Sequence, residues 1–168
     1  MKLKKGQFNF IDFITSIVVF AILLTIFFKY SPNITKSQEG ITGLAIEGRI
    51  ISDDLLSGGF PSNWNSSNVV IIGITDNNNQ INETKIQSLL SLSYPQTRNL
   101  FRTTYHYYFL FKDQDDSILK ITPTQEGIGY PGVNSSNIEN VDTQKLVKIE
   151  RIVFFRNQMA KLVLYLWQ

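Results

Sequence analysis

The chain begins with an apolar segment that is long enough to cross a lipid bilayer. Residues 8–28 comprise 21 positions and one charged side chain, Asp12. At about 1.5 Å per residue, a helix of this length spans roughly 31 Å, the thickness of a hydrocarbon core. Its aliphatic and aromatic residues fall on every face of the helix, so the pattern is not amphipathic. We therefore expect a helix surrounded by lipid or by other apolar helices.

A core helix and a secretory signal both fit this segment less well. A buried core helix would need a large protein around it, and this chain has 168 residues. A secretory signal would end in a small-x-small cleavage pattern, whereas Lys29, Tyr30, Ser31 and Pro32 follow the segment. We expect a retained single-pass helix in the cell membrane, with the basic N-terminus in the cytoplasm and the C-terminal domain outside the cell.

The residues that lead into the apolar segment form a distinctive junction, which reads Lys4, Lys5, Gly6, Gln7. This order, a short basic leader, a small residue and then Gln opening an apolar helix, resembles the class III signal of archaeal type IV pilin-like proteins. The resemblance implies that a prepilin peptidase cleaves between Gly6 and Gln7 and removes a leader of residues 1–6. It also implies that helix 7–30 first anchors the protein in the membrane and then packs against other pilin-like subunits in a surface filament.

Asp12 departs from the pattern of that family. Its acidic residue usually stands fifth in the mature chain, whereas Asp12 would stand sixth, and one residue turns a helical side chain by about 100°. A carboxylate in the apolar region costs on the order of 3 kcal/mol on insertion scales, so it needs a partner. Either the free amine of Gln7 in a neighbouring subunit serves in assembly as that partner, or Asp12 reaches the water at the headgroups.

Residues 31–59 are expected to form a second, amphipathic helix outside the membrane. Ser31 and Pro32 should break or kink the first helix. Apolar residues then recur near helical spacing over about 35–56, before Gly58 and Gly59. Glycines within this stretch would either permit close packing against a sheet or allow local melting of the helix. They are Gly40, Gly43 and Gly48.

Residues 60–168 are expected to form one extracytoplasmic, β-rich head domain. Runs of β-branched and aromatic residues predict strands. The expected strands are 69–74, 105–111, 118–122, 146–155 and 159–167. Asn82 is a good N-cap for a short helix that follows it, and residues 123–143 are rich in Gly, Asn and Ser, which predicts a long loop.

The last two expected strands give the clearest pattern. On either side of a turn at Arg156 and Asn157, nearly every second residue is apolar, whereas the residues between them are a mixture of charged, aliphatic and aromatic side chains. This pattern predicts an antiparallel hairpin with one apolar face. That face should lie on the helix expected at 35–56. A long helix followed by an antiparallel sheet gives an α+β fold.

The sequence offers little for catalysis. There is no cysteine, which excludes disulfides, zinc–thiolate sites and cysteine nucleophiles. His106 is the only histidine and stands among tyrosines on a predicted strand, so we expect a hydrogen-bonded member of an aromatic cluster and not a catalytic base. Neither a nucleophile elbow nor a phosphate-binding glycine motif is present. We expect no enzymatic activity, no catalytic residue and no cofactor.

Three carboxylates gather in one expected hairpin turn, at Asp113, Asp115 and Asp116. Such a turn can hold calcium in an extracellular domain, but the full twelve-residue calcium loop is absent. A solvated turn is the favoured interpretation, and calcium binding stays open.

Nucleic-acid binding has little support. The chain has 16 basic and 14 acidic residues, and three of the basic ones are the lysines of the expected leader. The mature chain would therefore carry a net charge of −1, without a long basic stripe.

Four asparagines match the N-glycosylation pattern Asn-x-Ser/Thr. They are Asn33, Asn65, Asn82 and Asn134. If Asn82 caps a helix its side chain is occupied, so the candidates for modification are Asn33, Asn65 and Asn134.

Two functions from different classes follow from these patterns. The first is a minor pilin or pilin-like subunit of an archaeal cell-surface filament, processed by prepilin peptidase. The second is a single-pass, membrane-anchored extracellular domain for binding or adhesion that does not polymerise. Short motifs of the head are also similar to those of archaeal pilin-like surface proteins: Leu55-Leu56, Gly59-Phe60-Pro61, Trp64, Ile72-Gly73-Ile74, Ile81-Asn82, Lys85 and 163–167.

Overall fold

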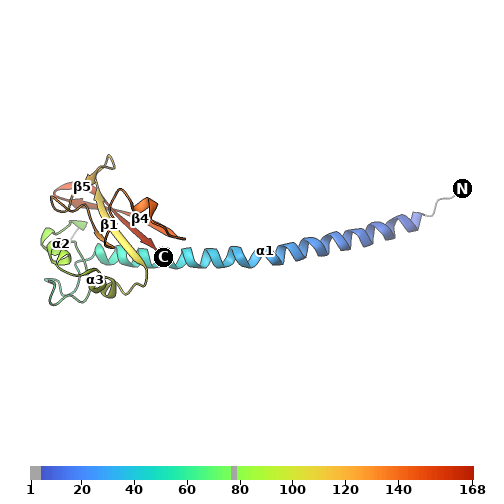
Figure 1. Ribbon diagram of the computed structural model, residues 1–168, viewed down its shortest axis with the longest axis horizontal. Helices are drawn as coiled ribbons and strands as arrows, with labels where there is room; N and C mark the ends of the chain where they lie inside the picture. The colour runs from blue at the N-terminus through green and yellow to red at the C-terminus, as the bar shows by residue number, and fades with distance from the viewer. Residues whose placement is uncertain (1–4, 77–78) are drawn as a thin grey trace. The chain divides into compact units, whose positions relative to one another are not determined.

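The computed structural model describes residues 5–76 and 79–168, except for the side chains of residues 5–9 and 31–39. The chain divides into two compact units, one ending at Gly40 and the other from Ile41 to Gln168. The first unit holds the N-terminal part of helix α1 (Lys5–Leu55), and the second holds the rest of α1 and the head domain (Figure 1). The fold is α+β, as the sequence predicted.

Helix α1 is continuous from Lys5 to Leu55. The predicted break at Ser31 and Pro32 is therefore wrong, since both residues lie within α1, and the membrane and amphipathic segments are two halves of one long helix. Proline removes one backbone donor, but the hydrogen bonds of the turns before and after it remain, so a helix can continue through it.

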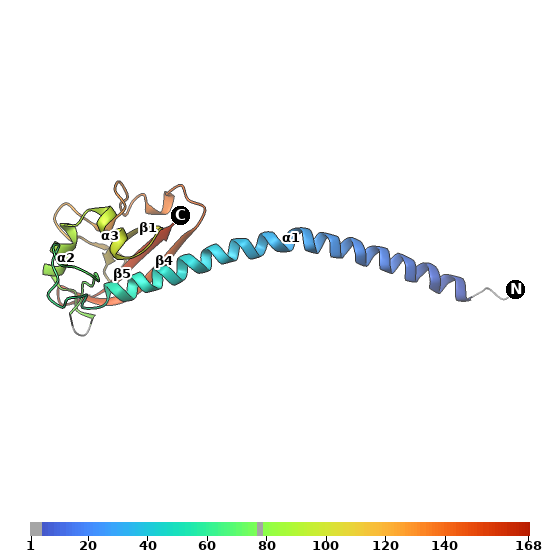
Figure 2. The ribbon, with the colours of Figure 1, turned by 90° about the horizontal axis from the view of Figure 1, so that it is seen from below.

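The part of α1 in the second unit packs its apolar face on the sheet, as predicted (Figures 1 and 2). Leu44, Ile51 and Leu55 are buried there. A Cβ atom on Gly48 would lie 2.6 Å from Cδ1 of Ile149, so only glycine allows the helix to approach the strand this closely without a shift of Ile149. Of the two roles expected for the stalk glycines, close packing is the one that Gly48 has.

The described residues form a five-stranded antiparallel sheet with strand order β2-β1-β5-β4, and β3 also pairs with β1. The strands are β1 (His106–Lys112), β2 (Ile118–Leu119), β3 (Gly127–Gly129), β4 (Leu146–Phe155) and β5 (Gln158–Trp167). The β4–β5 hairpin has the predicted turn, where Arg156 and Asn157 both adopt positive φ, at 52° and 62°. This is the backbone twist that a two-residue hairpin turn requires.

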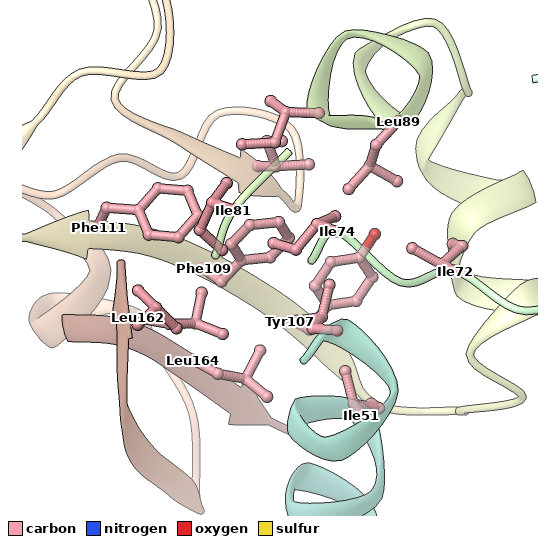
Figure 3. Close-up of a cluster of buried hydrophobic side chains, with 14 of the residues drawn as sticks. Ile51, Ile72, Ile74, Ile81, Leu89, Tyr107, Phe109, Phe111, Leu162 and Leu164 are labelled. Atoms are coloured by element: carbon pink, nitrogen blue, oxygen red, sulfur yellow. The ribbon is translucent and has the colours of Figure 1, made fainter. Parts of the chain in front are cut away.

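Alternation along β1 builds the main core. Tyr107, Phe109 and Phe111 point to the same side of the sheet (Figure 3) and are fully buried. They meet Ile51 of α1, together with apolar side chains from β5 and from the segment after α1: Leu162, Leu164, Ile72, Ile74 and Ile81.

The opposite face of the sheet is also buried, which corrects the prediction of one apolar face. Tyr108 and Leu110 of β1 and Val163, Tyr165 and Trp167 of β5 form a second apolar cluster. Ile138 covers it from the segment expected to be a bare loop at 123–143, which contains β3 and a short 3-10 helix, η2 (Ile138–Asn140). The sequence did not predict this cover, because the apolar residues that provide it are isolated among Gly, Asn and Ser.

The connection between α1 and β1 holds two short helices, α2 (Glu83–Leu90) and α3 (Tyr94–Leu100). Asn82 caps α2 as predicted, accepting hydrogen bonds from the backbone N–H groups of Thr84 and Lys85. The strand predicted at 69–74 is wrong, because this segment makes only the isolated bridge of Ile71 to Phe60. Its buried side chains fill the core without a neighbouring strand to pair with.

Candidate functional site

The N-terminal unit contains a helical segment, Phe10–Tyr30, that is long and apolar enough to cross a membrane. It has 21 residues, and every side chain in it is exposed. Aromatic and aliphatic side chains therefore face outwards all round the helix, as the absence of amphipathicity predicted. Such a surface is stable only in an apolar environment.

Three hydroxyl side chains of this segment are satisfied within the helix. Thr15 donates to the carbonyl of Ile11 at 2.9 Å, and Ser16 donates to the carbonyl of Asp12 at 2.8 Å. Thr25 donates to the carbonyl of Ala21 at 2.8 Å. Since each hydroxyl finds its acceptor four residues back, none of them needs water or a partner helix.

The predicted processing junction lies at the very start of this unit. Lys5, Gly6 and Gln7 open α1, their side chains lie outside the described residues, and residues 1–4 of the expected leader lie outside them altogether. Asp12 is exposed and makes no ion pair with a described side chain. Its carboxylate is therefore accessible from outside the helix, which is what either of its two predicted roles requires.

His106 lies in the aromatic cluster that the sequence predicted. Its Nδ1 is 3.1 Å from the hydroxyl oxygen of Tyr94, and its ring centroid is 4.4 Å from that of Tyr130 in an edge-on contact. The ring of Trp167 lies on another side, 5.8 Å away between centroids. Burial, and after it the charge of Arg98, lowers the pKa of His106, which favours the neutral form of the imidazole.

The acidic turn between β1 and β2 is held by its own hydrogen bonds. Oδ1 of Asp113 accepts from the backbone N–H groups of Asp115 and Ser117, at 2.9 and 2.8 Å. Asp116 accepts from Lys161 at 2.9 Å, and that hydrogen bond lowers the pKa of Asp116. Among residues 5–76 and 79–168, no group of three or more His, Cys, Asp and Glu side chains is placed to hold a metal ion.

The candidate glycosylation sites of the head lie in exposed turns. Oδ1 of Asn65 accepts from the backbone of Ser67, and Oδ1 of Asn134 accepts from that of Ser136. Asn82 differs, because its oxygen caps α2 and its Nδ2 donates to Asp76 at 3.0 Å. The side chain of Asn33 lies outside the described residues.

A hollow of about 430 Å³ lies beside α1 in the head unit. Its lining combines apolar and charged side chains, among them Glu47, Ile50, Asp54, Val70, Leu100 and Arg102. Burial raises the pKa of Asp54, and Arg102 opposes that rise. Sequence reasoning missed this hollow because its walls come from three separate segments, none of which carries a motif of its own.

No protein-family model, curated protein or solved structure matches this chain. Indications of function therefore come from the residues of the chain itself.

Proposed function

We propose that the chain is a minor pilin or pilin-like subunit of an archaeal cell-surface filament, processed by prepilin peptidase. One observation carries the proposal: a basic residue, Gly6 and Gln7 open an exposed apolar helix that is continuous with a helix packed on an α+β head. In this role the apolar surface of Phe10–Tyr30 has two successive environments, first lipid and then the helices of other subunits. Burial among helices replaces burial in lipid.

Cleavage at the junction tests this function. In cells that contain a prepilin peptidase, the mature protein should begin at Gln7, and N-terminal mass spectrometry should show the loss of residues 1–6. Gly6→Val should keep the leader, because the bulky side chain does not suit the cleavage position. Gly6→Ala is the matched control and should be cleaved, since the class III signal accepts either small residue. A native protein that keeps residues 1–6 contradicts the proposal.

Shearing distinguishes the filament subunit from the anchored binding domain. A filament subunit should be released from intact cells in a sedimentable form, whereas an anchored domain stays with the membrane fraction. The hollow beside Ile50 and Asp54 is the feature of the head that favours the second function, because it offers apolar and charged groups to a ligand.

A further inference from the structure

Strand β4 forms an outer edge of the sheet. It pairs with β5 along its whole length. Among the described residues, its other side makes one backbone hydrogen bond, at the end of the strand, where the N–H of Ile81 donates to the carbonyl of Phe154 at 2.8 Å. Backbone groups alternate in direction along an antiparallel strand. Since Phe154 directs its carbonyl outwards, the residues at even positions before it do the same. Leu146–Ile152 therefore presents a row of unpaired N–H and C=O groups.

The same even positions place their side chains on one face of the sheet, and their order is self-complementary. The apolar residues Leu146 and Ile152 stand at the two ends of this row, and the basic Lys148 and the acidic Glu150 stand between them. Leu146 and Ile152 are 37% and 65% exposed, which is unusual for large apolar side chains on a sheet. Lys148 and Glu150 are partly exposed and pair with each other at 2.6 Å.

We propose that β4 is a docking edge for a second copy of this chain, which adds its own β4 in antiparallel orientation about a twofold axis at Ile149. In this register Lys148 faces Glu150 of the second copy, and Leu146 faces Ile152 of the second copy. Each of these pairs is made twice, as a twofold interface requires. The paired residues all direct their backbone groups outwards, so the register also allows the hydrogen bonds between the strands.

Neighbouring registers are disfavoured by charge. A shift of two residues in one direction sets Lys148 against Lys148 of the second copy, and a shift in the other sets Glu150 against Glu150. Like charges directly opposite each other destabilise a strand pair. A shift of one residue would set each residue with outward-directed backbone groups opposite a residue whose groups point inwards to β5, so the hydrogen bonds could not form. The charges and the backbone directions therefore favour the register centred on Ile149 for a second copy of β4.

The inner face of β4 does not oppose this pairing. Arg151 is held within its own chain, donating to Oδ1 of Asp53 at 2.7 Å and to the hydroxyl of Ser52 at 3.1 Å. Its charge is thereby compensated before a second strand arrives. The residue on the axis, Ile149, packs against Gly48 of its own α1.

Within the head unit, the last turns of α1 lie alongside β4. Gly48 lies at Ile149 and Ser52 at Arg151, so residues 48–52 of α1 run in the same direction as β4. Antiparallel β4 strands therefore carry the two α1 segments in opposite directions. The pairing uses only the head unit, Ile41–Gln168, so it is distinct from the helix packing proposed above.

Disulfide trapping tests the pairing, because the chain has no cysteine of its own. The full chain in detergent micelles would carry Leu146→Cys in one preparation and Ile152→Cys in another. A mixture should form a disulfide-linked dimer on mild oxidation, since opposed strand residues have suitable Cα separations. Neither preparation alone should, because its cysteines would be about 20 Å apart. Linking that is equally strong in a single preparation overturns the proposal.

Charge reversal in the same cysteine variants tests the register of the two strands. Lys148→Glu in both preparations, or Glu150→Lys in both, should lower the yield of linked dimer about tenfold at concentrations below saturation. Lys148→Glu on one chain with Glu150→Lys on the other should restore it, which a folding defect could not do. Lys120→Glu, at an exposed lysine outside β4 and β5, is the control and should leave the yield unchanged. Yields that do not respond to reversal overturn the proposed register. These results do not depend on cleavage after Gly6, so failure of the filament proposal would be seen separately.

Discussion

At the scale of single residues, Lys85 shows how a charge can hold the head together. Its side chain is buried, and Nζ donates to the carbonyls of Gly58 and Thr75, both at 2.9 Å, and to Asp76 at 3.3 Å. These acceptors belong to the turn after α1 and to the segment that precedes α2. One ammonium group thereby joins two stretches of chain that have no regular strand to connect them.

Replacement of Lys85 should therefore be costly. Lys85→Met keeps the apolar stem but leaves carbonyl groups without a donor, and we expect the free energy of unfolding to fall by about 2 to 3 kcal/mol. Lys120→Met is the control at an exposed lysine and should change stability by less than about 0.5 kcal/mol. Urea denaturation of the two variants and the parent chain measures the difference. Equal midpoints for all three would show that Lys85 has no such role.

His106 should make the stability of the head depend on pH. Its pKa in the folded chain lies below its ordinary value of about 6.5, so the unfolded chain binds the proton more readily. Stability should then fall as the pH is lowered from about 6.5, and it should be unaffected above that value. In His106→Gln this part of the pH dependence should disappear. Denaturation at a series of pH values tests this, and an NMR titration of the single histidine gives its pKa directly.

At the scale of elements, sequence periodicity predicted what is local and missed what is made by distant segments. The β4–β5 hairpin and the cap of α2 at Asn82 follow from alternation and from one capping side chain, and both are confirmed. Helix α3 also has a local signal, since Ser93 and Gln96 form a capping box and Pro95 stands in the first turn, although periodicity alone does not predict this helix. The isolated bridge at Ile71 could not be predicted from the local sequence, because Ile72 and Ile74 are buried by contacts with distant segments and not by a neighbouring strand.

The break expected in α1 was wrong for a related reason. Pro32 indicates a helix stop, but its missing donor is a local cost, and α1 continues through it. Of the candidate site residues, the sequence placed His106 in its aromatic surroundings. The hollow at Ile50 and Asp54 and the position of β4 at the edge of the sheet became visible only once distant segments were placed side by side.

Two glycines should respond in opposite ways to the same substitution. Gly43 lies in α1, where a Cβ atom would be 3.4 Å from the hydroxyl of Tyr105, so Gly43→Ala should raise stability by about 0.5 to 1 kcal/mol. At Gly73 a Cβ atom would lie 2.2 Å from the backbone nitrogen of Gly59 and 2.4 Å from the carbonyl of Ser57. Gly73→Ala should therefore destabilise the head by about 1 to 3 kcal/mol. Thermal unfolding of both variants distinguishes these effects, and a loss of equal size at both positions would refute the assignment.

At the scale of the whole molecule, the chain combines a unit that needs an apolar environment with a unit that has a complete core. Residues 41–168 bury apolar clusters on both faces of the sheet, whereas Phe10–Tyr30 exposes its apolar side chains on all sides. Membrane association should depend on the first unit alone.

Charges placed in the middle of the apolar segment test this dependence. Val19→Lys combined with Phe20→Lys should cost about 6 kcal/mol of insertion free energy, at roughly 3 kcal/mol for each charge. The doubly substituted chain should be extracted from membranes by alkaline carbonate. A chain with Val19→Leu and Phe20→Leu should stay in the membrane pellet. Retention of both variants would mean that another part of the molecule provides the anchor.

The hydroxyl groups of Thr15, Ser16 and Thr25 have one further consequence. Each hydroxyl donates to a carbonyl in the preceding turn of the same helix, so the acceptor moves together with the donor. Transfer of this helix from lipid to the packed helices of the proposed filament would leave all three hydrogen bonds intact. At these three positions the transfer would incur no polar penalty and would depend only on how well the apolar surfaces fit.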